Sequence, residues 1–135
     1  MSLRKMVTRV AVAAAVVATG LAVAPSPASA AGGGCSTYVR NGWNIGVCSS
    51  DNGATVFGDV YVNARGSLGS SCYIYFSLNK DSLGGGDVAK RQDGCYSGRH
   101  GAISAPMSKG TYYTYAVVVV DGYNVNYGFS PNSTK

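Results

Sequence analysis

Residues 111–129 read TYYTYAVVVVDGYNVNYGF, and this stretch decides the fold class. The segment 111–120 consists almost entirely of β-branched and aromatic residues, which favour strands. Asp121-Gly122 is typical of a two-residue type I′ turn, so 123–129 is predicted to return as the second strand of a hairpin. Pairing outward from the turn gives an inner face made of Ala116, Val118, Val120, Tyr123, Val125 and Tyr127. The opposite face, with Val117 and Val119, is expected to be half-polar and exposed.

Similar patterns precede this hairpin. Residues 71–79 alternate, with Cys72, Ile74, Phe76 and Leu78 on one side and Tyr73, Tyr75 and Ser77 on the other. Further strands are predicted at 35–40, 43–48, 54–63, 88–92 and 100–107. Seven or eight short strands, with turns every 8–12 residues and no long helical pattern, predict an all-β fold. We expect a small antiparallel β-sandwich of Greek-key, immunoglobulin-like type.

Four cysteines, Cys35, Cys48, Cys72 and Cys95, predict two disulfides in an exported chain. A zinc site is the weaker alternative, because there is no C-x-x-C pair and only one histidine. If Asn41-Gly42 forms a type I′ turn, Cys35 faces Cys48 at a non-hydrogen-bonded position, where side chains stand closest. Cys72 and Cys95 then pair by elimination, and their bridge is expected to be buried.

Residues 1–30 have the three parts of a secretory signal peptide. Arg4, Lys5 and Arg9 are followed by an apolar run over 10–23 and by the cleavage sequence Ala28-Ser29-Ala30. The apolar run is shorter than the ~20 residues that a membrane-spanning helix needs. Cleavage would leave a flexible Gly-rich lead (31–34) and a single β domain (35–135). The sequence therefore predicts a secreted, extracellular protein without a membrane span.

The mature chain is low in charge. Without Arg4, Lys5 and Arg9, the 11 Lys and Arg fall to eight against six Asp, a net charge of +2. No basic run or stripe is present, so nucleic acid is not an expected partner.

The sequence contains few residues that could take part in catalysis. His100 is the only imidazole, and in its turn-rich stretch we expect a solvated surface residue. Asp51, Asp93 and Asp121 accompany turns, where Asp commonly bonds its own backbone. We therefore predict no catalytic residue, no metal site and no cofactor.

Ten tyrosines suggest a binding surface, since tyrosine offers a large, rigid contact area with a polar tip. The predicted partner-binding residues are Gly32, Gly33, Gly34, Trp43, Tyr61, Tyr73, Tyr75, Tyr113 and Tyr115. A purely structural interpretation stays open, because tyrosine also suits strands and Trp43 could equally pack its hairpin.

Four stretches carry a resemblance to known proteins: GVCSSDNG (46–53), VFGDVYVN (56–63), SCYIYFSL (71–78) and GTYYTYAV (110–117). With the Ala- and Val-rich signal, they resemble small two-disulfide secreted proteins of actinobacteria. In particular, the chain resembles the adaptor subunits of the umbrella toxin particles that Streptomyces-type bacteria release against competitors. The resemblance implies a non-enzymatic bridge between a lectin-bearing subunit and a repeat-built stalk, with the Gly-rich lead inserted into a partner cleft.

Two other functions remain open. A rigid two-disulfide domain could inhibit a secreted hydrolase through a loop such as 80–87 or 96–101. A sheet with stacked aromatic side chains could instead be a carbohydrate-binding module, although the chain contains a single Trp.

Overall fold

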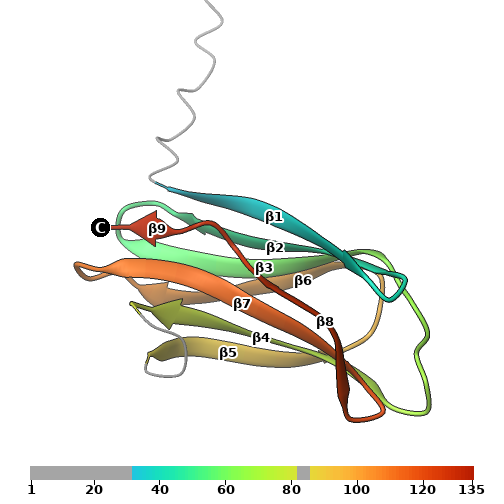
Figure 1. Cartoon of the computed structure of the whole chain (residues 1–135). Helices are drawn as coiled ribbons and strands as arrows, with labels where there is room; N and C mark the ends of the chain where they lie inside the picture. The colour runs from blue at the N-terminus through green and yellow to red at the C-terminus, as the bar shows by residue number, and fades with distance from the viewer. Residues whose placement is uncertain (1–31, 82–85) are drawn as a thin grey trace, which may run out of the picture.

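The computed structural model describes residues 32–81 and 86–135. The predicted signal peptide, Ala31 and residues 82–85 of the predicted 80–87 loop lie outside these residues. The fold is all-β, with two antiparallel sheets (Figure 1). The strands are β1 (Gly33–Arg40), β2 (Trp43–Asp51), β3 (Thr55–Ala64), β4 (Cys72–Lys80), β5 (Asp87–Gly94), β6 (Gly98–Pro106), β7 (Thr111–Val120), β8 (Tyr123–Phe129) and β9 (Ser133–Thr134). The two-residue strand β9 is an addition to the seven or eight that were predicted.

The strand order identifies a Greek key. One sheet has the order β1-β2-β3-β6 and the other the order β5-β4-β7-β8, with β9 beside β7. The chain crosses between the sheets after β3, β5 and β6, so that β3 pairs with β6 and β4 with β7. This is the immunoglobulin-like arrangement, with β1 as an additional strand at the edge of the first sheet. The predicted sandwich is confirmed.

A tyrosine at the start of β7 holds the connection between β6 and β7 in place. The hydroxyl of Tyr112 accepts a 2.9 Å hydrogen bond from the Ser108 backbone nitrogen and lies 3.2 Å from the Ser108 carbonyl oxygen, to which it can donate. The Tyr112 ring is buried in the core. This tyrosine corner is a hallmark of immunoglobulin-like sandwiches, and it holds the inter-sheet connection against the end of β7.

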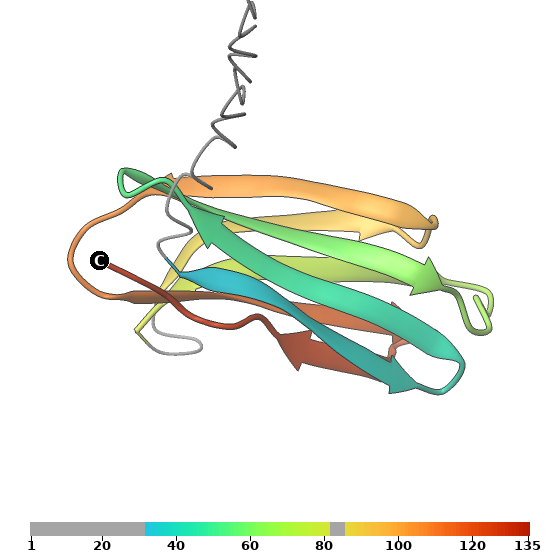
Figure 2. The ribbon, with the colours of Figure 1, turned by 90° about the horizontal axis from the view of Figure 1, so that it is seen from above.

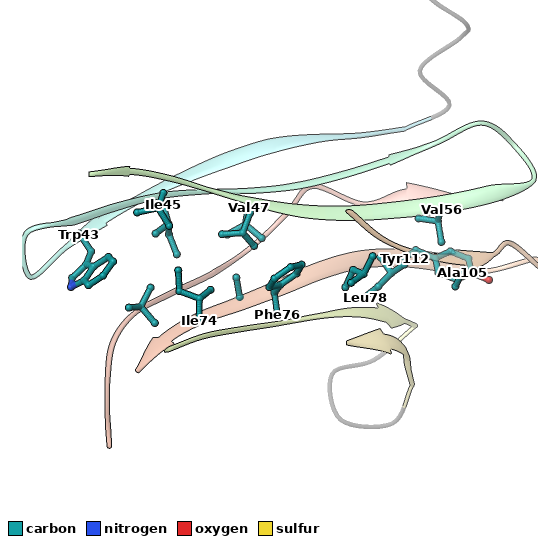
Figure 3. Close-up of a cluster of buried hydrophobic side chains, with 14 of the residues drawn as sticks. Trp43, Ile45, Val47, Val56, Ile74, Phe76, Leu78, Ala105 and Tyr112 are labelled. Carbon is teal, nitrogen blue, oxygen red and sulfur yellow. The ribbon is translucent and has the colours of Figure 1, made fainter. Parts of the chain in front are cut away.

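The core fills the space between the sheets (Figure 3). The inner face of the first sheet contributes Trp43, Ile45, Val47 and Val56, and the second contributes Ile74, Phe76, Leu78 and Tyr112. Successive side chains of a strand point to opposite faces of its sheet, so every second residue of each strand contributes to this core. The described residues include no long apolar helix of the kind that crosses a bilayer.

The first hairpin follows the predicted register. Asn41 and Gly42 both have positive φ, as a type I′ turn requires. Cys35 pairs with Cys48 and forms a disulfide with it. The second disulfide joins Cys72 on β4 to Cys95, just after β5. Both predicted connectivities are confirmed, but the Cys72–Cys95 bridge is only half-buried rather than buried.

In the last hairpin, the two residue pairs next to the turn match the predicted register, and the later pairs differ from it. The turn at Asp121-Gly122 is as expected, but a β-bulge follows between Val118 and Val119. A bulge shifts the pairing by one residue and therefore exchanges the faces of the strand beyond it. Asn126 consequently points into the core, where its amide nitrogen donates to the carbonyls of Tyr38 and Trp43. The predicted inward Tyr123 and Tyr127 are instead exposed.

Side chains join the free edges of β1 and β8, which lie beside each other (Figure 2). The Tyr38 hydroxyl donates to the Phe129 carbonyl at 2.7 Å, and the Asn41 amide donates to the Val125 carbonyl at 2.7 Å. The Tyr38 ring lies so close to Gly128 that a Cβ atom there would collide with it. The sandwich is thus closed along this side by hydrogen bonds between the two sheets.

Candidate functional site

The outer face of the β5-β4-β7-β8 sheet carries a continuous group of aromatic side chains. Tyr73 pairs with Val119, and Val117 is flanked by Tyr75 on β4 and Tyr127 on β8. Because directly paired residues share a face, these side chains are neighbours. The tyrosine face, as we call it, comprises Tyr73, Tyr75, Tyr113, Tyr115, Tyr127 and Phe129 around Val117 and Val119.

Ring contacts hold the β7–β8 part of this face together. The ring centroid of Phe129 lies 5.1 Å from that of Tyr115 and 6.0 Å from that of Tyr113, both in tilted arrangements. The Arg40 guanidinium, from the end of β1, lies 4.5 Å from the centroid of the Tyr127 ring. Tilted aromatic pairs and a cation over a ring are both stabilising, so these rings form an ordered surface.

The floor of the tyrosine face is apolar. Val117 and Val119 lie on the outer face, yet each is only 6% exposed. The expectation that they would be exposed is wrong, because Tyr75 and Tyr127 flank Val117, and Tyr73 covers one side of Val119. The result is a surface of phenol rings around an aliphatic centre.

The hydroxyls of Tyr75, Tyr113 and Tyr115 stay protonated at neutral pH. Burial raises the pKa of Tyr75, Tyr113 and Tyr115, and the negative charge of Asp87 raises the pKa of Tyr75 and Tyr113 further. Tyr75 also donates a 3.3 Å hydrogen bond to Asp87. Each of these three phenols is therefore uncharged and can donate or accept a hydrogen bond.

The structure brings together four of the predicted binding tyrosines, namely Tyr73, Tyr75, Tyr113 and Tyr115. Tyr127 and Phe129 complete the group, although the sequence pattern did not indicate them as binding residues. Regular alternation from the turn had assigned Tyr127 to the core, and only the bulge reverses it. Tyr61 lies on β3, in the other sheet, and is not part of the tyrosine face.

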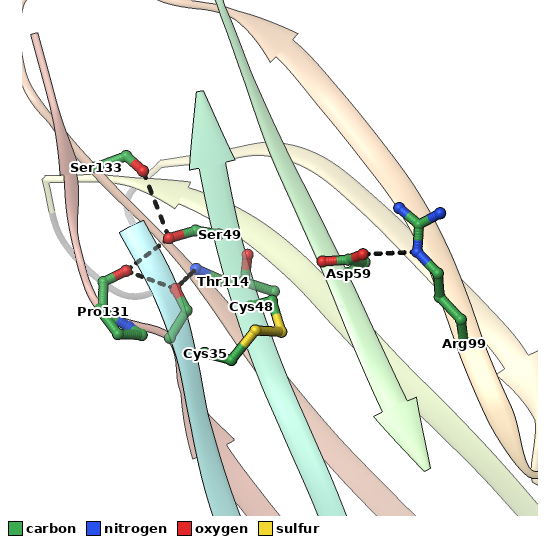
Figure 4. The surroundings of a disulfide bond; sticks show 9 residues. Cys35, Cys48, Ser49, Asp59, Arg99, Thr114, Pro131 and Ser133 are labelled. Atoms are coloured by element: carbon green, nitrogen blue, oxygen red, sulfur yellow. Dashed lines mark hydrogen bonds and ion pairs between the residues drawn. A yellow bond between two sulfur atoms is a disulfide. The ribbon is translucent and has the colours of Figure 1, made fainter. Parts of the chain in front are cut away.

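A second candidate site is an open depression of about 480 Å³ on the outer face of the first sheet. Its lining includes Gly32, Gly33, Gly34, the Cys35–Cys48 disulfide, Tyr61, Asp59 and Arg99. The Arg99 Nε donates to Asp59 Oδ2 at 2.7 Å, and Figure 4 shows Asp59 between the disulfide and the guanidinium. We refer to this site as the depression.

The Gly-rich lead is ordered where it borders the depression. Gly33 and Gly34 belong to β1, and the Gly33 nitrogen donates to the Asn132 carbonyl at 2.8 Å. The expectation of a flexible segment is therefore wrong for Gly32–Gly34. Gly33 has a φ of +91°, and a Cβ atom there would collide with the Ser49 carbonyl, which explains why glycine is needed.

No family model, curated protein or solved structure matches this chain. Its candidate function therefore rests on the chemistry of the tyrosine face and the depression.

Trp43 is not a surface anchor. Its side chain is 1% exposed and belongs to the core beneath the first hairpin. The prediction that it binds a partner is wrong, and the alternative of hairpin packing is correct. Its position explains this, since Trp43 pairs with Arg40 and starts the inner row of β2.

His100 is buried rather than solvated, which corrects the sequence prediction. It lies in β6 beside β5, where its ring stacks on Tyr96 with centroids 3.8 Å apart. Asp93 accepts hydrogen bonds from the Tyr96 hydroxyl at 2.9 Å and from Arg91 Nε at 2.7 Å, and lies 3.0 Å from His100 Nδ1. Because His100 is enclosed by these partners, the cluster serves to join β5 to β6.

Proposed function

We propose that this chain is a secreted, non-enzymatic adaptor that binds a partner protein through the tyrosine face. The proposal includes the role implied by the resemblance, as a bridge between subunits of an extracellular antibacterial toxin complex. The observation that carries it is the continuous aromatic group on the outer face of the second sheet.

The tyrosine face has the chemistry of a protein-binding surface. Tyrosine is enriched in the buried centres of protein interfaces, where charged residues are depleted. Here the phenols of Tyr75, Tyr113 and Tyr115 are neutral, and the rings surround an aliphatic centre made of Val117 and Val119. A partner that covers the face would remove apolar surface from water while meeting hydroxyls that can exchange water for protein hydrogen bonds.

Rigidity also favours binding by this face. The rings stand on β4, β7 and β8, which are paired along most of their length. Side chains held on paired strands lose less conformational entropy on association than those on a loop, so more of the contact free energy is available for affinity. The two disulfides support the secreted setting, because such bonds persist in oxidising compartments.

The test begins with the protein purified from its native secretion under mild conditions. We expect it to elute with other secreted proteins at fixed stoichiometry, in an assembly of several hundred kilodaltons by light scattering. The double variant Tyr75→Ser/Tyr115→Ser should elute free of these proteins, since removing two central rings typically weakens binding by at least about tenfold. Circular dichroism of the variant checks that the sheet is retained.

Tyr123→Ser is the matched control, because Tyr123 is 75% exposed at a hairpin end and lies outside the tyrosine face. It should leave the assembly intact. A protein that elutes as a free monomer, or a double variant that stays in the assembly, contradicts the proposal. Inhibition of a protease or amylase by the monomer would favour the inhibitor function instead.

A further inference from the structure

The depression has the size and lining of a small-ligand site. Its volume of about 480 Å³ falls within the 300–1,000 Å³ that is usual for such sites. The Cys35–Cys48 disulfide and the backbone of Gly33 and Gly34 contribute apolar atoms, and Tyr61, at 36% exposure, contributes an aromatic ring. A few polar groups on an otherwise apolar lining are the usual means of orienting a ligand.

Asp59 and Arg99 supply these polar groups. Only the Nε–H of Arg99 is used by Asp59, so four of its five N–H donors make no hydrogen bond to any described residue. Asp59 likewise uses one carboxylate oxygen, and its second oxygen has no hydrogen bond to the described part of the chain. The pair therefore presents unused donors beside an unused acceptor.

The pair is also held in place. Arg99 lies directly opposite Tyr61 across the β3–β6 pairing. Gly101 lies so close to Asp59 that an added Cβ atom would come within 2.5 Å of the Asp59 Cβ. The absence of a side chain at Gly101 leaves room for the carboxylate to reach Arg99, so the arrangement of donors and acceptor exists before any ligand binds.

The charge of the site favours an uncharged ligand. An anion attracted by Arg99 would be repelled by Asp59, whose carboxylate oxygen is 2.7 Å from the guanidinium, and a cation would meet the reverse conflict. A ligand with adjacent hydroxyl groups satisfies both residues, because each hydroxyl can accept from the guanidinium and donate to the carboxylate. It also needs an apolar side to lie on Tyr61 and the disulfide.

A pyranose ring has both properties, with vicinal hydroxyls around its edge and C–H groups on its faces. We propose that the depression binds an uncharged saccharide residue. A C–H face of the sugar lies against the Tyr61 ring and the disulfide, and two adjacent hydroxyls bridge Asp59 and Arg99. The depression and the tyrosine face are on the outer sides of opposite sheets, so this proposal is independent of the proposed partner binding.

The test is a nuclear magnetic resonance titration of the ¹⁵N-labelled secreted protein. The probes are glucose, galactose, mannose, rhamnose, N-acetylglucosamine and N-acetylgalactosamine, each added to about 50 mM, with sodium acetate and sodium sulfate as anionic probes. At least one sugar should produce saturable shifts at residues 33–35, 59–61 and 99–101, and the two salts should not.

Two variants test the hydrogen bonds between the sugar and the Asp59–Arg99 pair. Asp59→Asn and Arg99→Lys should each weaken binding of that sugar at least tenfold, because Asn loses an acceptor and Lys loses the planar fork of donors. Arg65→Lys is the matched control and should leave the affinity unchanged, since Arg65 is exposed and outside the depression. Unchanged amide spectra elsewhere show that each variant is folded.

Three outcomes would overturn the proposal. The first is the absence of saturable shifts with every sugar. The second is saturation by acetate or sulfate alone, which would make the site an anion site. The third is sugar-dependent shifts confined to the tyrosine face. The first two outcomes leave the proposed adaptor function unaffected, because it is tested with variants on the other sheet. The third would favour the carbohydrate-binding alternative for the tyrosine face.

Discussion

His100 Nδ1 lies 3.0 Å from Asp93 Oδ2, and His100 Nε2 lies 2.7 Å from the carbonyl oxygen of Tyr96. A backbone carbonyl and an ionised carboxylate can only accept hydrogen bonds. His100 therefore acts as the hydrogen-bond donor to Asp93 when this carboxyl is ionised. This pair lies where the edges of β5 and β6 meet, and Arg91 on β5 adds a 3.2 Å hydrogen bond to the Gly101 carbonyl on β6.

The first prediction concerns the pH dependence that Asp93 confers. Burial raises the pKa of Asp93, but hydrogen bonds from Arg91, His100 and Tyr96 outweigh burial and lower this pKa overall. A carboxyl whose pKa is lowered by folding stabilises the folded state above its unfolded pKa of about 4. That contribution is lost as the pH falls through the folded pKa.

We therefore expect Asp93→Asn to lower the free energy of unfolding at pH 7, and the gap to the wild type to narrow below about pH 4. Urea unfolding followed by circular dichroism across this pH range measures the gap. Asp87→Asn is the control, since the Asp87 carboxylate accepts one 3.3 Å hydrogen bond at the surface. A gap that stays constant with pH would show that Asp93 does not act through its charge.

The second prediction concerns the tyrosine corner. Tyr112→Phe keeps the buried ring but removes the hydroxyl that accepts from the Ser108 nitrogen. We expect a loss of about 0.5–1.5 kcal/mol in the free energy of unfolding, the usual net contribution of an intramolecular hydrogen bond. Tyr123→Phe should change stability little, because that residue is exposed. An equal effect of both changes in urea denaturation would contradict the role given to the corner.

The third prediction concerns the contact between β1 and β8. Gly128→Ala places a methyl group where the Tyr38 ring now lies, and should cost about 1–3 kcal/mol of stability through overpacking. Gly94→Ala is the matched control at the end of β5, where an added Cβ atom meets nothing within 4 Å. Thermal unfolding compares the two, and a Gly128 variant as stable as the Gly94 variant would refute the close contact.

The fourth prediction concerns the disulfides. The bridges close loops with sequence separations of 13 and 23 residues. Loop entropy then predicts a loss of about 3 kcal/mol when either is removed, and slightly more for the longer loop. Paired alanine variants, Cys35→Ala/Cys48→Ala and Cys72→Ala/Cys95→Ala, test this by urea unfolding. If the shorter loop mattered far more, interactions other than chain entropy would have to explain it.

The sequence was sufficient to predict the fold class and the first hairpin. Alternation and the Asn41-Gly42 turn are local signals, and they fixed the Cys35–Cys48 pairing together with the inner row of β4. Such signals are strong because a shift of one residue would turn every core side chain toward solvent.

Features that depend on distant residues could not be predicted in this way. The bulge at Val118 and Val119 turns Asn126 inward, where its amide reaches the carbonyls of Tyr38 and Trp43, which lie 88 and 83 residues away in the chain. His100 likewise looked solvated from its polar neighbours, because its partner Asp93 becomes apparent only when β5 and β6 are placed side by side.

The candidate site could be predicted only in part, because it also depends on residues that are distant in the sequence. Alternation placed Tyr73 and Tyr75 on one face of β4, and Tyr113 and Tyr115 on one face of β7. It could not show that these strands are neighbours. The Asp59–Arg99 pair joins residues 40 apart in the sequence, and no local pattern indicated it.

The junction of β1 and β8 has a consequence for self-association. Edge strands with free backbone groups can template the addition of a strand from another molecule, which is a route to amyloid. Here the carbonyls of Val125 and Phe129 on β8 already accept hydrogen bonds from the side chains of Asn41 and Tyr38. A foreign strand would have to displace these bonds before it could add, which protects this side of the protein from fibril growth at high concentration.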